Sequence, residues 1–121
     1  MSGLPYRKSC CSECPWRKDV DPGRFPPQAF KDLAKTSYDI ARKVFACHKS
    51  EEATSVICAG FLLRGAAHNL TVRMGAIEGS IDLRLVKDEG LNLFDDFKSM
   101  AIANGVRPSD SSLVDCRSQK Y

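Results

Sequence analysis

The chain has 121 residues, of which 43% are hydrophobic and 27% are charged, and its formal net charge is +3. This length and hydrophobic content suit one domain with one modest core, and they exclude a disordered chain and two independent domains. The net charge is too small to identify a nucleic-acid-binding protein. We therefore expect a single domain over residues 1–121, with cysteine-rich loops over 1–60 and a helical part over 61–121.

The sequence offers no targeting or membrane signal. No run approaches about eighteen uncharged apolar residues, and the stretch from Met1 to Ser9 is short, polar and basic, unlike a signal peptide. These observations predict a cytoplasmic protein that does not associate with a membrane. The six cysteines then need a role other than disulfide bonding, because a reducing compartment rarely keeps structural disulfides.

The first predicted helix covers about residues 27–36. Pro27 suits the first turn of a helix, and Phe30 and Leu33 follow at helical spacing. A cluster of proline and glycine over residues 21–27 predicts the loop before it. The next segment, residues 38–46, fits a short strand and a second short helix equally well.

The clearest predicted helix follows Cys58. Apolar residues recur there at steps of four, three, four and three: Leu63, Ala67, Leu70, Met74 and Ile77. This spacing predicts one helix with one apolar face, which ends at Gly79. Residues 81–85 alternate apolar and charged side chains, a pattern that a short strand or a two-turn connector would produce.

A last helix is predicted to begin at Asn92, which is a suitable N-cap, with Asp95 and Asp96 in its first turn and Gly105 just past its end. Its expected apolar face consists of Leu93, Phe97, Met100 and Ala101. A second capping cluster follows at residues 109–112. The elements together predict a helix-rich small domain, either mainly α or α+β.

Four cysteines have the spacing of metal ligands. Cys11 and Cys14 are separated by two residues, which allows both sulfur atoms of one turn to reach the same ion. Cys47 and Cys58 are close enough in sequence for one loop to present both. Cys58 also precedes the predicted helix, whose first N–H groups stabilise a thiolate. The pattern predicts a metal site that stabilises and organises the domain, with four cysteine ligands: Cys11, Cys14, Cys47 and Cys58.

Neighbouring residues leave the ligand set open at two positions. Cys10 could replace Cys11, and His48 could replace Cys47 to give a site of three cysteines and one histidine, although adjacent side chains point in different directions. Cys116 is remote in sequence and is expected to be a free or core thiol. Instead of a metal site, the cysteines could form a redox-active pair or be unrelated buried thiols. The redox pair is poorly supported because no strand precedes it.

The predicted metal is zinc, which suits a closed site in a small domain because binding supplies folding free energy. A [4Fe–4S] cluster is the alternative, since four cysteines can also hold it and Pro15 follows Cys14 as in cysteine–proline steps near ferredoxin clusters. Basic residues near the cysteines would offset the charge of either centre: Arg7, Lys8, Arg17, Lys18 and Lys49.

Three motifs carry a resemblance to a known family. They are Cys11-Ser12-Glu13-Cys14-Pro15-Trp16-Arg17, Phe45-Ala46-Cys47-His48 and Cys58-Ala59-Gly60-Phe61. Over about residues 8–65 the chain resembles a family of small bacterial and bacteriophage proteins of unknown function. The resemblance implies a metal or cluster site and no assigned activity, and it suggests an accessory role of phage or prophage type only by association. The doubled Cys10-Cys11 departs from the family's pattern.

No catalytic set is recognisable, so we expect that the protein is not an enzyme. The sequence has two histidines and neither a Ser/His/Asp arrangement nor a glycine-rich phosphate loop. Arg64, His68 and Arg73 could form a phosphate or substrate patch, but a solvated helix face or a cap over the metal site accounts for them better.

The expected function is that of an intracellular metal-binding accessory protein that binds a host protein partner. Residues 1–50 carry ten Lys or Arg against five Asp or Glu, whereas residues 51–121 carry eight against ten. This division favours a mixed-charge protein partner over nucleic acid. The acidic residues in question are Asp88, Glu89, Asp95 and Asp96.

Two alternative functions remain open. One is an iron–sulfur protein with a redox or sensing role. The other is a zinc-dependent nucleic-acid-binding module that would use Arg7, Lys8, Arg17 and Lys18 with Trp16. For Trp16, packing on the cysteine turn is the favoured role over stacking on a base.

Overall fold

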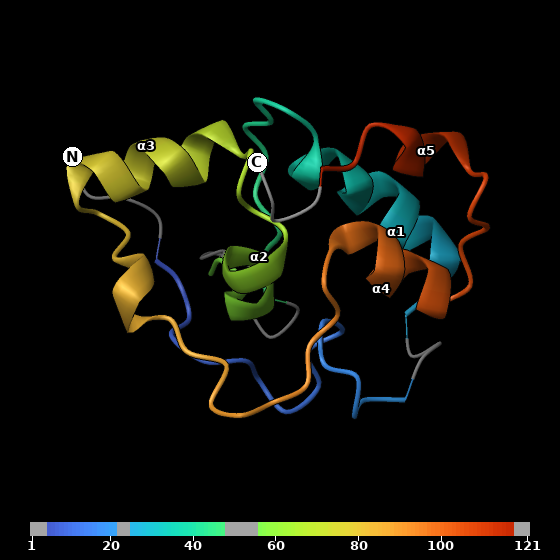
Figure 1. The fold of residues 1–121 in the computed structure, drawn as a ribbon, viewed down its shortest axis with the longest axis horizontal. Coiled ribbons are helices and arrows are strands. Elements are labelled where there is room, and N and C mark those ends of the chain that lie inside the picture. The colour runs from blue at the N-terminus through green and yellow to red at the C-terminus, as the bar shows by residue number, and fades with distance from the viewer. Residues whose placement is uncertain (1–4, 22–24, 48–55, 118–121) are drawn as a thin grey trace.

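The structure is a computed structural model that describes residues 5–21, 25–47 and 56–117. Its helices are α1 (Pro27–Leu33), α2 (Ala59–Arg64), α3 (Leu70–Glu78), α4 (Phe97–Ala103) and α5 (Ser111–Val114), with 3₁₀ turns η1 (Ala34–Ser37) and η2 (Leu83–Leu85). Within the described ranges the β pairings are isolated bridges, so the domain is mainly α. Helices α1, α4 and α5 gather at one end, α2 lies centrally, and α3 lies along an edge at the other end (Figure 1).

The helix predicted at residues 27–36 is confirmed as α1 running directly into η1. Pro27 occupies the first turn, where a missing N–H costs nothing. Residues 38–46 form neither the strand nor the helix that the sequence allowed. They make isolated bridges instead, which pair Tyr38 with Cys116, Ala41 with Asn69 and Ala46 with Ile57.

The single helix predicted after Cys58 is wrong, because α2 ends at Arg64 and α3 begins at Leu70. Asn69 starts the second helix, since its side-chain oxygen accepts a hydrogen bond from Val72 N at 3.0 Å. Its Nδ2 donates to Thr36 O at 3.0 Å and Lys43 O at 2.8 Å, and the residue is 0% exposed. This buried amide ties three segments together and sets where α3 begins.

The break also changes which face of the helix is buried. Met74 and Ile77, expected in the core, are exposed, while Val72 and Gly75 are buried. Gly79 ends α3 as predicted, with a left-handed φ of 89°. Residues 81–85 contain the 3₁₀ turn η2, Leu83–Leu85, so the strand is wrong, and the connector is shorter than the two turns expected.

The last long helix begins later than predicted. Asp96, and not Asn92, is the N-cap of α4, and its carboxylate accepts a hydrogen bond from Ser99 N at 2.8 Å. The residues before it extend along the cysteine turn, where Phe94 N donates to Trp16 O at 3.0 Å. The predicted apolar face is confirmed for the three members that lie on α4, since Phe97, Met100 and Ala101 are buried. Leu93 is buried too, but it lies before the helix and forms a bridge with Arg17.

Trp16 lies at the centre of the core and is 0% exposed. Its ring centroid lies 5.8 Å from that of Phe45 and 5.9 Å from that of Phe97, both in edge-to-face geometry. Helix α2 approaches the indole through two glycines, since a Cβ on Gly60 would lie 2.5 Å from Trp16 Cβ and one on Gly65 would lie 2.6 Å from Trp16 Cη2. The predicted packing role of Trp16 is confirmed.

Candidate metal centre

The first cysteine pair lies on a tight turn. Cys14 N donates to Cys11 O at 3.2 Å, and Arg17 N donates to Cys14 O at 3.1 Å. These two successive turns explain why a two-residue spacing brings both side chains to one side of the backbone. The turn also carries Trp16, which is buried in the core.

The second cysteine pair lies on two segments that run antiparallel. Cys47 N donates to Val56 O at 2.6 Å, and Cys58 N donates to Phe45 O at 2.9 Å. Ala46 and Ile57 form the bridge between the two segments. The segments that carry Cys47 and Cys58 therefore lie side by side, and Cys58 directly precedes α2 as predicted.

The sulfur atoms of these segments meet in pairs inside the core. Cys14 Sγ lies 3.5 Å from Cys58 Sγ, and Cys14 also shares a hydrogen bond with Cys10. A second hydrogen bond joins Cys11 to Cys47. All four predicted ligands are at most 5% exposed, whereas Cys10 is half-buried.

These contacts distribute charge unequally among the thiols. Hydrogen bonds from Cys10 and Cys58, followed by those from the backbone N–H groups of Trp16 and Gly60, hold the pKa of Cys14 well below its usual range. The pKa values of Cys10 and Cys58 rise because each hydrogen-bonds to Cys14 and is desolvated. The hydrogen bonds therefore favour negative charge on Cys14 over negative charge on Cys10 or Cys58.

One of the predicted basic neighbours lies on the cysteine turn itself. Arg17 Nη1 donates to Cys11 O at 3.2 Å, and its charge offsets part of the rise in the pKa of Cys10. The guanidinium also forms two hydrogen bonds with Asp19, at 2.8 Å and 2.6 Å. Lys18 instead lies over the ring of Phe94, at 5.7 Å from its centroid.

The described residues do not form a complete coordination sphere. Within residues 5–21, 25–47 and 56–117, no three side chains of His, Cys, Asp or Glu are arranged so that they could hold a metal ion. The cysteines meet through pairwise contacts, with Cys14 joined to Cys10 and Cys58 and with Cys11 joined to Cys47. The donor set nevertheless fits a soft metal, because it is buried, sulfur-rich and supplied with N–H groups.

The remaining site predictions have separate outcomes. His48 and Lys49 lie outside the described residues. Cys116 is a half-buried free thiol that hydrogen-bonds to Ala34 O and Ser112 O, at 3.6 Å and 3.7 Å. Burial is the largest cause that raises its pKa to about 12.

The possible phosphate patch is divided between elements. Arg64 lies on α2 and pairs with Asp88 at 3.8 Å. His68 lies between the helices, and its Nδ1 is 3.7 Å from Asp39 Oδ1. The single helix that would have aligned Arg64, His68 and Arg73 does not form.

Sequence reasoning missed how the motifs depend on one another. Gly60 of the third motif lies against Trp16 of the first, and Phe45 of the second lies 6.1 Å from Phe61 of the third, centroid to centroid. The signal was present, since each motif combines cysteine with an aromatic residue or glycine. The spacing offers Cys10 only as a substitute for Cys11, yet the structure places it on Cys14.

No helix in the part of the chain that the structure describes is long and apolar enough to cross a membrane. None of the curated proteins compared with the chain matches it, and none of the solved structures does.

A family model matches residues 6–117, which is most of the chain. It is described as a family of unknown function, DUF6283, in agreement with the unknown function that the sequence resemblance implied. The bacterial and bacteriophage setting stays a prediction. The match spans all three cysteine motifs, and the chain therefore belongs to the family of unknown function DUF6283.

Proposed function

We propose that the protein is a small metal-binding accessory protein in which Cys11, Cys14, Cys47 and Cys58 bind one zinc ion. One observation carries the proposal: four cysteines from three motifs, each at most 5% exposed, belong to one buried core, where Cys14 contacts Cys58 and Cys11 contacts Cys47. If the cysteines were unrelated buried thiols, there would be no reason for cysteines of different motifs to contact one another. Zinc would link these segments and supply free energy for folding.

The surroundings of Cys14 support a thiolate ligand. The backbone N–H groups of Trp16 and Gly60 donate hydrogen bonds to its sulfur atom. Arg17 adds a positive charge beside the turn. These groups stabilise negative charge on sulfur, which a metal-bound cysteine carries.

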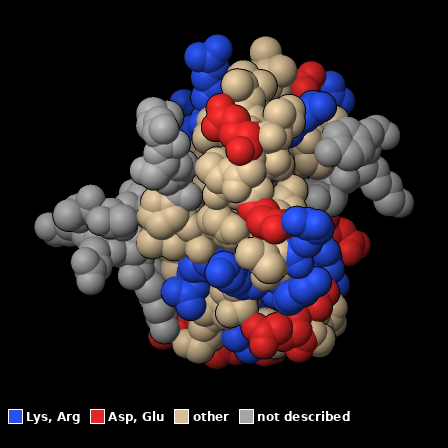
Figure 2. Space-filling view, turned by 90° about the vertical axis from the view of Figure 1, so that its left-hand side faces the viewer, with Lys and Arg blue, Asp and Glu red and all other residues tan. Residues whose placement is uncertain are grey.

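We further propose that the protein acts by binding a host protein, in an accessory role of phage or prophage type. Basic and acidic side chains alternate along the lower part of one face, as Figure 2 shows, and this pattern suits a mixed-charge protein surface better than a polyanion. The nucleic-acid alternative has less support. Trp16 is fully buried, and Arg17 already pairs with Asp19.

The metal is tested by purifying the protein anaerobically and measuring its metal content and visible spectrum. We expect about one zinc per chain and no broad band near about 400 nm. Cys14→Ser and Cys58→Ser should lose the metal because each removes a ligand. Cys116→Ser is the matched control and should retain it, since Cys116 lies against Ala34 and Ser112.

Other results would contradict specific parts of the proposal. Bound iron together with a broad visible band would refute zinc and identify an iron–sulfur cluster instead. Full metal content in Cys58→Ser would refute the ligand set. An exchangeable oxygen ligand seen by X-ray absorption would refute the closed structural site and favour catalysis.

The partner is tested by affinity capture from the native host, with the zinc-loaded protein as bait and the Cys58→Ser variant as control. We expect a host protein that binds the loaded bait and not the variant. Recovery of nucleic acid alone, lost when Arg17 and Lys18 are replaced by Glu without loss of metal, would refute the protein partner.

A further inference from the structure

Helix α3 presents an apolar stripe to solvent. Met74 is 49% exposed and Ile77 is 85% exposed, and half-buried Leu70 precedes them on the same side of the helix. The helix lies along one edge of the molecule (Figure 1). A short helix gains most of its stability from packing of an apolar face, so a stripe of this kind is typical of a contact surface.

Charged residues of opposite sign flank this stripe. At about 100° per residue, Met74 and Ile77 lie about 60° apart, and Arg73 and Glu78 lie about 70° to either side of their midline. Arg73 and Glu78 are both exposed. The arrangement corresponds to positions g, a, d and e of a heptad, where a and d form the seam between two helices.

The charges distinguish two ways of pairing this helix with a copy of itself. In a parallel pair about a two-fold axis, position g of one helix faces the following position e of the other. Arg73 would then face Glu78 of the second copy, twice by symmetry. In an antiparallel pair each flanking residue would face its own counterpart, so like charges would meet.

We propose that the protein forms a two-fold homodimer in which the α3 helices of two chains pack in parallel through Met74 and Ile77. Arg73 of each chain pairs with Glu78 of the other. This inference does not depend on the proposed metal or on its role.

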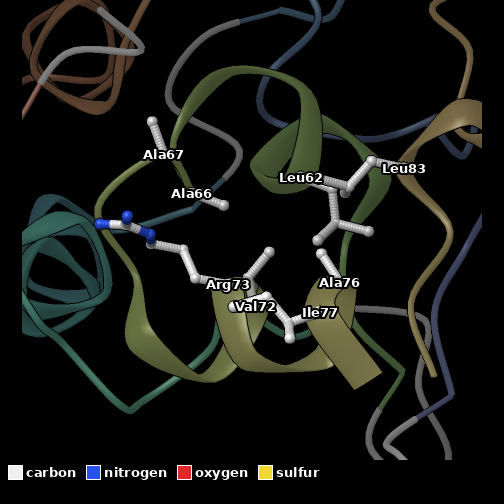
Figure 3. A pocket seen from close by; sticks show the side chains of 8 residues that line it. All are labelled: Leu62, Ala66, Ala67, Val72, Arg73, Ala76, Ile77 and Leu83. Atoms are coloured by element: carbon white, nitrogen blue, oxygen red, sulfur yellow. The ribbon is translucent and has the colours of Figure 1, made fainter. Parts of the chain in front are cut away.

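The groove beside the stripe supplies additional apolar surface. It has a volume of about 280 Å³ and is lined by Leu62, Ala66, Ala67, Val72, Arg73, Ala76, Ile77 and Leu83. Ile77 forms one wall, and Leu83 of η2 is 42% exposed beside it (Figure 3). Two nine-residue helices alone would bury too little surface for a stable dimer, so the second copy must also cover this flank.

Arg73 must turn for this pairing to form. In the single chain its side chain extends along the groove toward Ala66 and Ala67 (Figure 3). Arg73 already makes an interaction within the chain, so the ion pair with Glu78 of the second copy would replace that interaction. A long exposed arginine has several accessible rotamers, so this exchange is compatible with the structure.

The dimer is tested by sedimentation equilibrium of the metal-loaded protein over a range of concentrations. We expect a dimer, and we expect Arg73→Glu and Glu78→Arg each to raise the dimer Kd at least about tenfold. The double variant should restore the Kd to within about threefold, because the swapped charges still attract. A mixture of the two single variants should form the heterodimer.

A second pair of variants tests the apolar seam. Ile77→Asp should raise the Kd about a hundredfold, whereas Val114→Asp, at an equally apolar residue of α5 that is 74% exposed, should leave it unchanged. Circular dichroism and metal content check that each variant is folded. A wild-type monomer up to about 100 µM would overturn the proposal. So would a double variant as weak as the single ones, or a dimer that tolerates Ile77→Asp.

Discussion

Cys10 and Cys11 are adjacent in sequence but have different partners. Cys11 is buried and hydrogen-bonds to Cys47, whereas Cys10 is half-buried and hydrogen-bonds to Cys14. Cys11 therefore joins the second cysteine pair to the turn, and Cys10 supports the thiolate from outside. The spacing of the sequence allowed either residue as the ligand, and the partners favour Cys11.

The first prediction separates these two roles. Cys11→Ser should lose most of the bound metal because it removes a ligand, whereas Cys10→Ser should keep about one metal per chain. Because Cys10 donates a hydrogen bond to Cys14, Cys10→Ser should weaken metal affinity by about tenfold without abolishing it. Competition with a coloured zinc chelator measures both. The opposite pattern would assign Cys10 as the ligand.

The second prediction concerns Gly60, which is pressed against the core tryptophan. A Cβ there would lie 2.5 Å from Trp16 Cβ, a rigid atom next to the backbone, so Gly60→Ala should lower the free energy of unfolding by about 2–3 kcal/mol. Gly90→Ala is the control. Its φ is 80° but nothing lies near its Cβ position, so it should cost only about 1 kcal/mol.

Chemical denaturation of both glycine variants measures the difference. Equal costs would mean that α2 shifts away from Trp16 without penalty, and that close packing of the first and third motifs does not account for the glycine.

At the scale of single elements, helix α5 depends on its cap. It has four residues, which is too short for a stable isolated helix. Asp110 accepts hydrogen bonds from Ser112 Oγ at 2.6 Å and Ser112 N at 2.9 Å, and it pairs with Lys31 of α1 at 3.2 Å. The carboxylate thus both starts α5 and attaches it to α1.

The third prediction is a dependence of stability on pH through Asp110. The hydrogen bond from the Ser112 hydroxyl, with the Ser112 N–H and Lys31, lowers the pKa of Asp110 from 3.8 to about 2. A lowered pKa means that this contribution to stability is present above pH 3.8 and is lost as the pH falls toward 2.

Melting temperatures measured from neutral pH downward test this dependence. Asp110→Asn keeps the cap but loses the charge, so wild type should melt higher at neutral pH and the difference should disappear as the pH falls to about 2. Ser112→Ala removes the hydroxyl donor, so the loss of stability should begin at a higher pH, nearer the ordinary pKa of an aspartate. A difference that stays constant with pH would contradict the role of the charge.

The buried face of helix α3 is decided by its neighbours and not by its own apolar period. The apolar period that predicted a buried face runs through Leu70, Met74 and Ile77. The structure buries the other side instead, where Gly75 lies against Ile81, since a Cβ on Gly75 would be 2.7 Å from Ile81 Cδ1. The period therefore describes a surface that a second chain is proposed to cover.

At the scale of the whole molecule, the contacts among the cysteines join segments that have few other regular contacts. The segments around residues 5–7, 45–47 and 56–58 are connected by isolated bridges and a few backbone hydrogen bonds, such as Arg7 N to Ile57 O at 3.0 Å. The helices at the other end, α1, α4 and α5, lie in contact with one another (Figure 1). The Trp16 core connects the two ends.

The fourth prediction is that metal removal destabilises the whole domain. A strong chelator should lower the melting temperature by more than about 10 °C, because structural zinc contributes folding free energy that a chain of this size cannot replace. Added zinc should restore it. Cys116→Ser should respond like wild type. Cys58→Ser should have a low melting temperature from the start, and the chelator should not lower it further. An unchanged melting temperature in the metal-depleted wild type would refute a structural role.

Several features could be predicted from the sequence because they depend on local chemistry. Pro27 begins α1, Gly79 and Gly105 adopt left-handed backbone where helices end, and the apolar face of α4 is buried. Each follows from the geometry of a few adjacent residues. The cysteine spacing likewise predicted the turn that carries Cys11 and Cys14, because that turn depends on a short chain separation. For Cys47 and Cys58 the spacing predicted one loop that presents both, and the structure places them on two segments that lie side by side.

Tertiary contacts decided the rest. Asn69 interrupts the long predicted helix because its side-chain amide donates hydrogen bonds to the backbone carbonyl groups of Thr36 and Lys43, which are distant in sequence. Residues near Asn92 stay extended because Phe94 donates to the backbone of Trp16. The contact of Cys14 with Cys58, at 3.5 Å between the sulfur atoms, joins residues that are far apart in sequence. Periodicity describes the preference of one segment, whereas a buried amide or thiol must satisfy its hydrogen bonds wherever the fold supplies them.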